Sequence, residues 1–385
     1  MYQSAASMFK NKKVLILGFG REGMSTYRFL RNMYPDMHLT IADKNEIKLD
    51  DKNVTLICGD SYMDSLNDFD IVMKSPGIAF LDVDIKDGTL VTCQTDLFLK
   101  FAPCRKVGIT GSKGKTTTST LIYDMLKEGG FDARLIGNIG VPVLEDINTV
   151  TPETIAVIEM SSHQLEFTTS SPEVAVLTNI YEEHLDHYRD GFRGYVNAKL
   201  NIVRRQKEGD TFIYNATQGL DGLCDLDKIK SHKVGVKKDA PLPFAVNNEH
   251  LLGEHNRQDI LFAFEAAKHF GVDTAAAERA VEKFSGIEHR MEKVGTFRGI
   301  TFYNDCIATI PHAVECAVEA LKNVDTLIFG GMDRGLDYSE FENYLKKSNI
   351  KNLIGTPATG HKICDKIEGA PQKNVYKAAN LDEAV

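Results

Sequence analysis

The chain has 385 residues, of which 43% are hydrophobic and 26% are charged, and its formal net charge is −9. This length predicts two or three domains at roughly 100–200 residues each. The negative charge argues against a general nucleic-acid binder, because clustered Lys and Arg hold phosphate backbones. Its seven cysteines show no CxxC spacing, and no apolar run is long enough to span a bilayer. We therefore expect a cytoplasmic protein without a secretory signal, a nucleic-acid partner or a membrane partner.

Short Val-, Ile- and Leu-rich runs alternate along the chain with longer segments of helical period, a pattern typical of parallel sheets with crossover helices. The first runs are KKVLILGFG, LTIAD, VTLICG and DIVMKSPG. The pattern restarts at FAPCRKVGIT, continues through TIAVIEM, VAVLTN and TFIYN, and leads into a helical stretch from about 255 to 284. It restarts once more with GITFYND, DTLIFGG and KNLIGT.

These restarts predict an α/β protein of three domains. We expect a Rossmann-like domain over 1–103, a central P-loop ATPase-like α/β domain over 104–287, and a Rossmann-like α/β domain over 288–385. Because the chain stops in what reads as the start of a helix, we expect the third domain to be incomplete.

A first glycine loop follows the first strand. Gly18, Gly20 and Gly23 form a GxGxxG pattern, and Asp43 ends the next strand twenty residues beyond Gly23. This is the Rossmann dinucleotide fingerprint, with a carboxylate suited to a ribose hydroxyl. A sugar-nucleotide diphosphate is favoured over NAD here, because a phosphate loop follows in the next domain. Glycines that merely allow close packing of helix on strand are the structural alternative.

The strongest pattern is VGITGSKGKTTTSTLIYDML, an apolar strand, a glycine loop and an amphipathic helix. Glycines let backbone N–H groups cradle phosphate oxygens, and the helix N-terminus adds partial positive charge. Lys115 would span the β- and γ-phosphates, and a Thr hydroxyl would hold Mg²⁺. The loop is a shortened relative of GxxxxGK[ST], since Ile109 stands where the first glycine is usual. The predicted ATP-binding residues are Gly111, Ser112, Lys113, Gly114, Lys115, Thr116 and Thr117.

Two further strands of the central domain end in polar side chains. Glu159 ends TIAVIEM, and Asn179 ends VAVLTN ahead of His184. Ligands of open α/β sheets lie at such strand ends, and Mg²⁺ takes few protein ligands. Since histidine is an uncommon magnesium ligand, His184 could equally cap a helix or contact substrate. Taken alone, Lys199 in GYVNAKLNI reads as an ordinary helical lysine.

Ten segments together resemble the Mur ligase family of bacterial cell-wall synthesis, over nearly the whole chain. They are GITGSKGKTTT, IGNIG, EMSSHQLE, NIYEEHLDHY, NAKLNI, LLGEHN, EHRME, YNDCIAT, GGMDRGLDY and TGHKI. YNDCIAT favours the glutamate-adding branch of that family. The resemblance implies a monomeric ATP-dependent ligase that joins D-glutamate to UDP-N-acetylmuramoyl-L-alanine through an acyl-phosphate, with two Mg²⁺ ions.

The resemblance also implies roles for particular residues. Catalytic residues would be Lys115, Glu159, His184 and Lys199, and the metal site would be formed by Thr116, Glu159, His184 and Lys199, the last carried as a carbamate. The UDP-sugar would meet Gly18, Arg21, Asp43, Gly77 and Asn138. Asn256 and Asp259 would lie near the adenine of ATP. Arg290 and Asp305, in the third domain, would close on ATP. Thr309 and Arg334 would lie near the incoming amino acid.

Four rival functions stay open on the sequence. Another Mur ligase would add a different amino acid, and folylpolyglutamate synthase shares the phosphate-loop domain but lacks the GxGxxG domain in front of it. A nucleotide-dependent switch would hydrolyse ATP without making a product. An NAD-dependent oxidoreductase would leave the phosphate loop, Glu159 and His184 unexplained.

Overall fold

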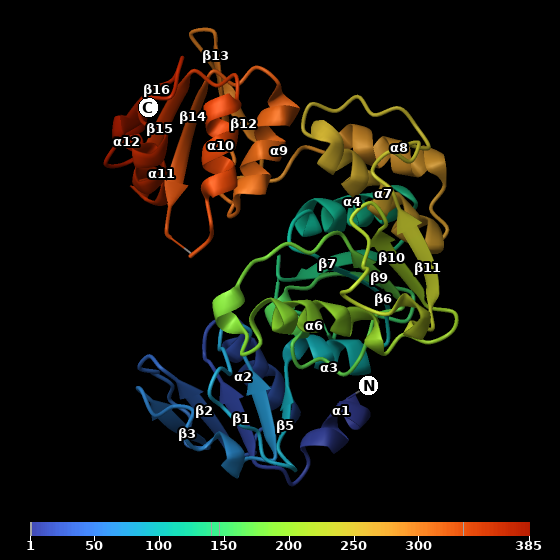
Figure 1. Cartoon of the computed structure of the whole chain (residues 1–385). Helices are drawn as coiled ribbons and strands as arrows, with labels where there is room; N and C mark the ends of the chain where they lie inside the picture. Colours follow the sequence, from blue (N-terminus) through green and yellow to red (C-terminus); the bar gives the residue numbers. More distant parts are fainter. Residues whose placement is uncertain (1, 140, 146, 334) are drawn as a thin grey trace. The chain divides into compact units, whose positions relative to one another are not determined.

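A computed structural model describes residues 2–139, 141–145, 147–333 and 335–385 (Figure 1). The chain forms two compact units. The first unit takes residues up to 248 together with 256–284, and the second takes 249–255 and 285–385. The predicted α/β class is confirmed, since parallel sheets alternate with helices in both units.

The first sheet of the first unit is wholly parallel, in the order β3-β2-β1-β4-β5. Its strands are β1 (Val14–Leu17), β2 (Leu39–Asp43), β3 (Val54–Cys58), β4 (Ile71–Lys74) and β5 (Leu90–Thr92), and its helical segments are α1 (Tyr2–Phe9), α2 (Arg21–Met33), η1 (Leu66–Asp68) and α3 (Gln94–Phe101). Both faces of β1 are buried, as in sheets covered on two sides. The strand order reverses between β1 and β4, the kind of point at which open α/β sheets bind ligands.

The second sheet of the first unit is also parallel, in the order β11-β10-β9-β6-β8-β7. Its strands are β6 (Arg105–Thr110), β7 (Ala133–Gly137), β8 (Ile155–Glu159), β9 (Val174–Leu177), β10 (Thr211–Asn215) and β11 (His232–Val236). Its helical segments are α4 (Lys115–Glu128), α5 (Ser162–Leu165), η2 (Leu185–His187), α6 (Gly191–Arg204), η3 (Leu226–Lys228), α7 (Gly253–His269) and α8 (Thr274–Lys283). Because β6 lies between β8 and β9, the loops that follow these three strands meet at one edge.

The helical stretch expected from 255 to 284 is two helices, α7 and α8. Gly271 has a φ of +99°, a conformation that L side chains rarely adopt, and it breaks the helical path. Asp273 then caps α8, its side chain accepting from the Ala276 N–H at 2.7 Å. The apolar periodicity of the two helices runs on through this break, so the pattern alone did not reveal it.

The second unit contains a parallel sheet and a separate hairpin. The hairpin strands are β12 (Glu292–Phe297) and β13 (Ile300–Asn304), the sheet strands are β14 (Thr326–Gly331), β15 (Asn352–Ala358) and β16 (Asn374–Lys377), and the helices are α9 (Pro311–Leu321), α10 (Ser339–Lys347), α11 (Thr359–Ile367) and α12 (Leu381–Ala384). GITFYND was expected in a parallel sheet, yet β13 pairs antiparallel with β12. Arg298 and Gly299 both have positive φ, which suits a tight two-residue turn.

Hydrophobic side chains join the two sheets of the first unit into one core. A single cluster includes Val14 and Ile16 of the first sheet and Ala156 and Ile158 of the second, all at most 1% exposed. Among the described residues, no helix combines the length and apolarity needed to cross a membrane. The exact domain boundaries near 103 and 288 stay a prediction.

Candidate functional site

The loop between β6 and α4 is shaped by contacts that leave no room for side chains at its glycines. A Cβ at Gly111 would lie 1.9 Å from Thr178 Oγ1, and one at Gly114 would lie 2.4 Å from Asp259 Oδ1. Asn179 secures the loop from the end of β9, because its Oδ1 accepts from the Lys113 N–H at 2.8 Å. The loop backbone is therefore fixed by its neighbours, as a preformed phosphate cradle requires.

Two lysines converge on one carbonyl of this loop. Lys115 Nζ donates to Gly111 O at 2.8 Å, and Lys199 Nζ, from α6, donates to the same oxygen at 2.7 Å. Lys199 is 2% exposed, and its ammonium lies 4.6 Å from the centre of the Tyr195 ring. Burial, together with repulsion from Lys115, holds the pKa of Lys199 well below its usual range.

Glu159 lies at the carboxyl end of β8, next to the strand that feeds the loop. It is 1% exposed, and its Oε1 accepts from Asn138 Nδ2 at 2.7 Å. Its Oε2 is buried and accepts no hydrogen bond from the described residues. A buried carboxylate oxygen without a hydrogen bond costs free energy unless a cation binds it. Carboxylate oxygens are ligands that Mg²⁺ prefers. The residues present therefore fit a magnesium ion, although no group of three His, Cys, Asp or Glu side chains in the described chain surrounds a common point.

The segment after β9 contacts the phosphate loop through Glu183 and carries His184. Lys113 Nζ pairs with Glu183 Oε1 at 3.1 Å, with the Glu183 side chain 9% exposed. His184 takes a left-handed backbone, φ +55°, at the start of η2, and its side chain does not cap that helix. Its ring lies 4.8 Å from that of His163, centre to centre. The helix-capping alternative for the His184 side chain is thereby removed.

The GxGxxG loop lies at the reversal point of the first sheet. Gly18 has φ +89°, and a Cβ there would lie 2.8 Å from Ser75 Cβ, on the loop after β4 that also carries Gly77. A Cβ at Gly23 would lie 1.9 Å from Gly18 O, so this glycine permits close packing of α2 on β1. Asp43 Oδ2 accepts from the Phe19 N–H at 2.6 Å, which orders the loop itself. Arg21 is the first residue of α2.

The other predicted residues divide between the two units. Asn256 and Asp259 are both 6% exposed on the part of α7 that belongs to the first unit. Asp259 lies against the phosphate loop and accepts from Thr118 Oγ1 at 3.2 Å. Arg290, Asp305 and Thr309 belong to the second unit, where Asp305 Oδ1 accepts from the Met291 N–H at 3.1 Å. Arg334 lies outside the described residues.

Several contacting side chains were not singled out from the sequence. Tyr195 OH lies 2.6 Å from Ser112 Oγ, in the loop. Gln164 belongs to a capping box with Ser161 at the start of α5, a pattern readable as S-x-x-Q in EMSSHQLE. Lys74 is a charged residue that ends a buried strand, which is itself an unusual feature of DIVMKSPG.

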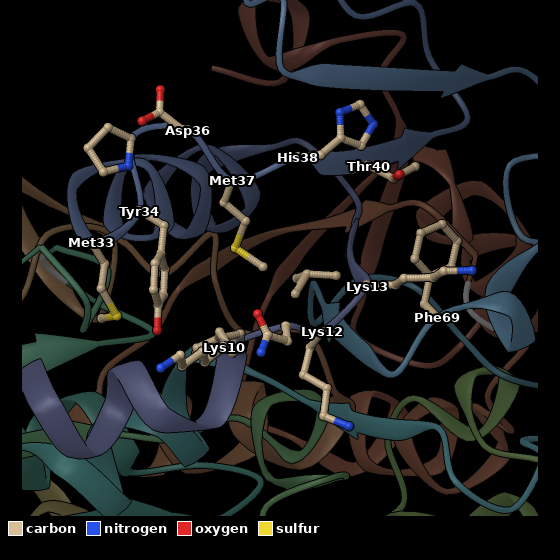
Figure 2. A pocket seen from close by; sticks show the side chains of 14 residues that line it. Lys10, Lys12, Lys13, Met33, Tyr34, Asp36, Met37, His38, Thr40 and Phe69 are labelled. Atoms are coloured by element: carbon tan, nitrogen blue, oxygen red, sulfur yellow. The ribbon is translucent and has the colours of Figure 1, made fainter.

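A cavity lies elsewhere in the first unit. It has a volume of about 650 Å³ at the amino-terminal ends of β1 and β2, opposite the strand ends described above. Figure 2 shows Lys10, Lys12, Tyr34 and His38 among the side chains that line it. The cavity has none of the predicted site residues in its lining, so the phosphate loop and the GxGxxG loop belong to a different part of the molecule.

Family profiles match three successive parts of the chain. The Mur ligase MurD-like N-terminal domain matches residues 12–91, the Mur ligase middle domain 109–267, and the Mur ligase glutamate ligase domain 289–385. The chain therefore belongs to the Mur ligase family, and the resemblance inferred from its motifs is confirmed.

Its relatives are more specific. The chain is 33% identical to a UDP-N-acetylmuramoylalanine–D-glutamate ligase of Clostridium kluyveri, covering 98% of this chain and 88% of the relative. It is 34% identical to the protein of the same name from Ligilactobacillus salivarius, covering 98% and 91%. Among solved structures, the MurF ligase of Thermotoga maritima in complex with ADP is similar in fold, with a TM-score of 0.61 at 16% identity over 95% of this chain and 85% of that one.

Proposed function

We propose that this Mur ligase uses ATP to join D-glutamate to UDP-N-acetylmuramoyl-L-alanine, a step of peptidoglycan precursor synthesis. The observation that carries the proposal is the convergence of Lys115 and Lys199 on Gly111, beside the buried carboxylate of Glu159. Relatives named for this reaction match nearly the whole chain. An energy-coupled ligase needs such a place, where the charge of a transferring phosphoryl group can be offset.

The glycine loop holds the ATP phosphates in this proposal, through backbone N–H groups and the N-terminus of α4. The substrate carboxylate attacks the γ-phosphorus, a new P–O bond forms, and ADP leaves with the electron pair of the broken bond. Lys115 moves from its resting contact with Gly111 O to the phosphate oxygens. The amine of D-glutamate then attacks the acyl carbon, phosphate leaves, and the amine proton passes to solvent or to a nearby base.

Magnesium would be held by Glu159, Thr116 and His184. When bound, it would neutralise phosphate charge and align the reacting oxygens. We also propose that Lys199 is carbamylated. Its lowered pKa favours the neutral amine, which can add to CO₂ with loss of a proton and so become a two-oxygen anion. A carbamate would also replace repulsion of Lys115 with attraction.

The UDP-sugar is proposed to lie at the reversal point of the first sheet. Gly18 and Gly77 border this point, Arg21 starts the adjoining helix, and Asn138 reaches Glu159 from the second sheet. Asp43 supports the site by ordering the Phe19 amide, and its second oxygen accepts from the Asn45 N–H at 2.8 Å. Asp43 therefore shapes the loop in addition to any contact with the ligand.

The remaining roles follow the three-domain division at about residues 103 and 288, which we retain as a proposal. Asn256 and Asp259 border the adenine side, and Arg290 and Asp305 act on ATP from the third domain. Thr309 and Arg334 are assigned to the incoming amino acid. We place the reaction in the cytoplasm, where ATP is available and the seven free cysteines suit a reducing compartment, and we expect a monomer.

Phosphate release, measured against a panel of UDP-muramoyl precursors and amino acids, tests the proposal. We expect release only when UDP-N-acetylmuramoyl-L-alanine and D-glutamate are both present. A preference for another amino acid would identify a different Mur ligase. A steady ATPase rate that ignores both substrates would instead support a non-ligating nucleotide switch and contradict the proposal.

A further inference from the structure

An ion pair between a buried lysine and a partly buried glutamate connects the proposed UDP-sugar side of the first unit to its proposed ATP side. Lys74, the last residue of β4, has a side chain only 2% exposed, and its Nζ lies 3.2 Å from Glu166 Oε2. The ammonium also lies 5.5 Å from the ring centre of Phe80 and 5.4 Å from that of Phe167. Placing a lysine this deep is expensive unless it is paired, so the position of its partner matters.

Each end of this pair adjoins a different part of the proposed site. Lys74 is followed by Ser75, whose N–H donates to Leu17 O at 2.8 Å and whose Oγ donates to Gly18 O at 3.0 Å. Lys74 is thus one residue from the loop proposed for the UDP-sugar. Glu166 follows α5, the short helix that begins three residues after Glu159.

Glu166 is also tied to the rest of the central sheet. The same Oε2 lies 3.3 Å from Nε2 of His187, at the end of the segment that carries His184. The Glu166 carbonyl accepts from Asn201 Nδ2 at 3.1 Å, on α6, two residues beyond Lys199. One carboxylate therefore contacts the first sheet and the histidine segment, and its backbone contacts the helix of the buried lysine.

A second contact fixes α5 to the first sheet. Gln164 Nε2 donates to Glu22 Oε1 at 2.8 Å, on α2, the helix that follows the GxGxxG loop. Cys93 Sγ donates to Gln164 O at 3.2 Å. The helix α5 is held from two directions, and the Lys74–Glu166 pair is the ionic part of that attachment.

We propose that Lys74 and Glu166 are positioning residues, which fix the UDP-sugar loop after β4 at a set distance from the phosphoryl-transfer site beyond β8. The inference rests on the proposed function. Neither residue touches ATP in this scheme. A displacement of about 1 Å between reacting groups costs roughly 100-fold in rate, so the pair would act on the rate of phosphoryl transfer and leave nucleotide affinity alone.

The test compares Lys74→Met and Glu166→Gln with the double variant in the full chain. We expect kcat for phosphate release to fall roughly 100-fold in each single variant, while the KM for ATP and its calorimetric Kd stay within about twofold. The double variant should be no slower than the slower single variant, because the two residues act as one pair.

Asp84→Asn is the matched control. The Arg189–Asp84 pair, at 3.0 Å, also links the part of the chain that forms the first sheet to the part that forms the second. Its two side chains are 53% and 92% exposed. Such a pair contributes little, so kcat should stay within about twofold of the parent protein. A kcat in Lys74→Met equal to that of Asp84→Asn would overturn the inference, and so would a parallel loss of kcat, ATP affinity and thermal stability.

Hydrogen exchange separates this inference from the proposed function. Amides of 162–167 should exchange at least tenfold faster in Lys74→Met than in Asp84→Asn, while those of β6 are unchanged. If the parent protein released no phosphate with both substrates, the proposed function would fail, and the exchange comparison would still decide whether the pair anchors α5. Unchanged exchange in 162–167 would contradict the anchoring.

Discussion

The two glycine loops of the first unit share a local plan but differ in what surrounds them. Each follows a buried parallel strand and starts a helix at the carboxyl edge of its sheet. Around Gly18 the close neighbours are the side chains of Ser75 and Ile78, and the carboxylate of Asp43 accepts from the Phe19 amide. Around Gly111 the amino groups of Lys115 and Lys199 both donate to a single carbonyl.

This difference shows how similar turns acquire different chemistry. The first loop is ordered by the Asp43 carboxylate, and its glycines pack closely against neighbouring atoms. The second loop gathers the partly buried Lys115 from α4 and the buried Lys199 from α6, with the buried Glu159 carboxylate on the next strand. Ionisable groups that lose this much hydration are typical of sites that bind a charged ligand. We expect charge to govern the function of the second loop and packing to govern the stability of the first.

The largest effect is expected from Lys115→Ala. Removing this ammonium should lower phosphate release by roughly 10³-fold or more, because charge compensation is the main contribution of a protein to phosphoryl transfer. Release would be followed with both substrates saturating. Lys127→Ala, in the last turn of the same helix and exposed, is the control and should leave the rate unchanged. Comparable rates for the two variants would remove charge as the distinguishing property of the second loop.

Lys199→Ala should lower the rate by roughly 10²–10³-fold, the usual cost of losing one preorganised charge in a site. If the working form is a carbamate, short carboxylates such as acetate should restore part of the activity by placing an anion in the vacated space. Mass spectrometry under CO₂ should show the carbamate on the parent protein. An unaffected Lys199→Ala enzyme would refute the carbamate proposal.

Packing is tested in the first loop by Gly23→Ala. Its Cβ would lie 1.9 Å from Gly18 O, a backbone atom that cannot move aside, so we expect a loss of about 3 kcal/mol in the free energy of unfolding. Denaturant titration would measure it. At Gly20 of the same motif a Cβ meets no described atom within 4 Å, so Gly20→Ala should cost only about 1 kcal/mol or less, from the poorer helix N-cap that alanine makes for α2. Equal losses at both positions would contradict the packing argument.

The smallest effect concerns Asp124 on α4, behind the phosphate loop. Burial, with repulsion from Glu128, raises the pKa of its carboxyl from 3.8 to about 6. A raised carboxyl pKa means that the folded chain binds more protons, so stability falls as pH rises from about 4 to about 6. Asp124→Asn should therefore gain about 1 kcal/mol relative to the parent at pH 7 and nothing at pH 3.5, the gain being reduced by solvent screening. Thermal melts across this range would measure it, and a gain independent of pH would exclude ionisation as the cause.

Local patterns in the sequence were enough to predict most helices and strands and several residues of the site. The apolar strand, glycine turn and GKTTT helix predicted the phosphate loop, because a backbone cradle is built from neighbouring residues. Alternating apolar runs predicted parallel α/β sheets, and the ends of those strands pointed to Glu159 and Asn179. Family motifs added Lys199, which its own helix did not distinguish.

Tertiary structure alone decided which distant side chains meet. Lys199 reaches Gly111 across 88 positions, and Glu166 joins Lys74 to His187, contacts that depend on how α5 and α6 pack rather than on any local pattern. The break between α7 and α8 and the antiparallel hairpin after 291 also escaped the periodicity, since each depends on single residues with positive φ. Short-range preferences determine the elements, whereas burial and pairing of charge are set by neighbours that only the folded chain brings together.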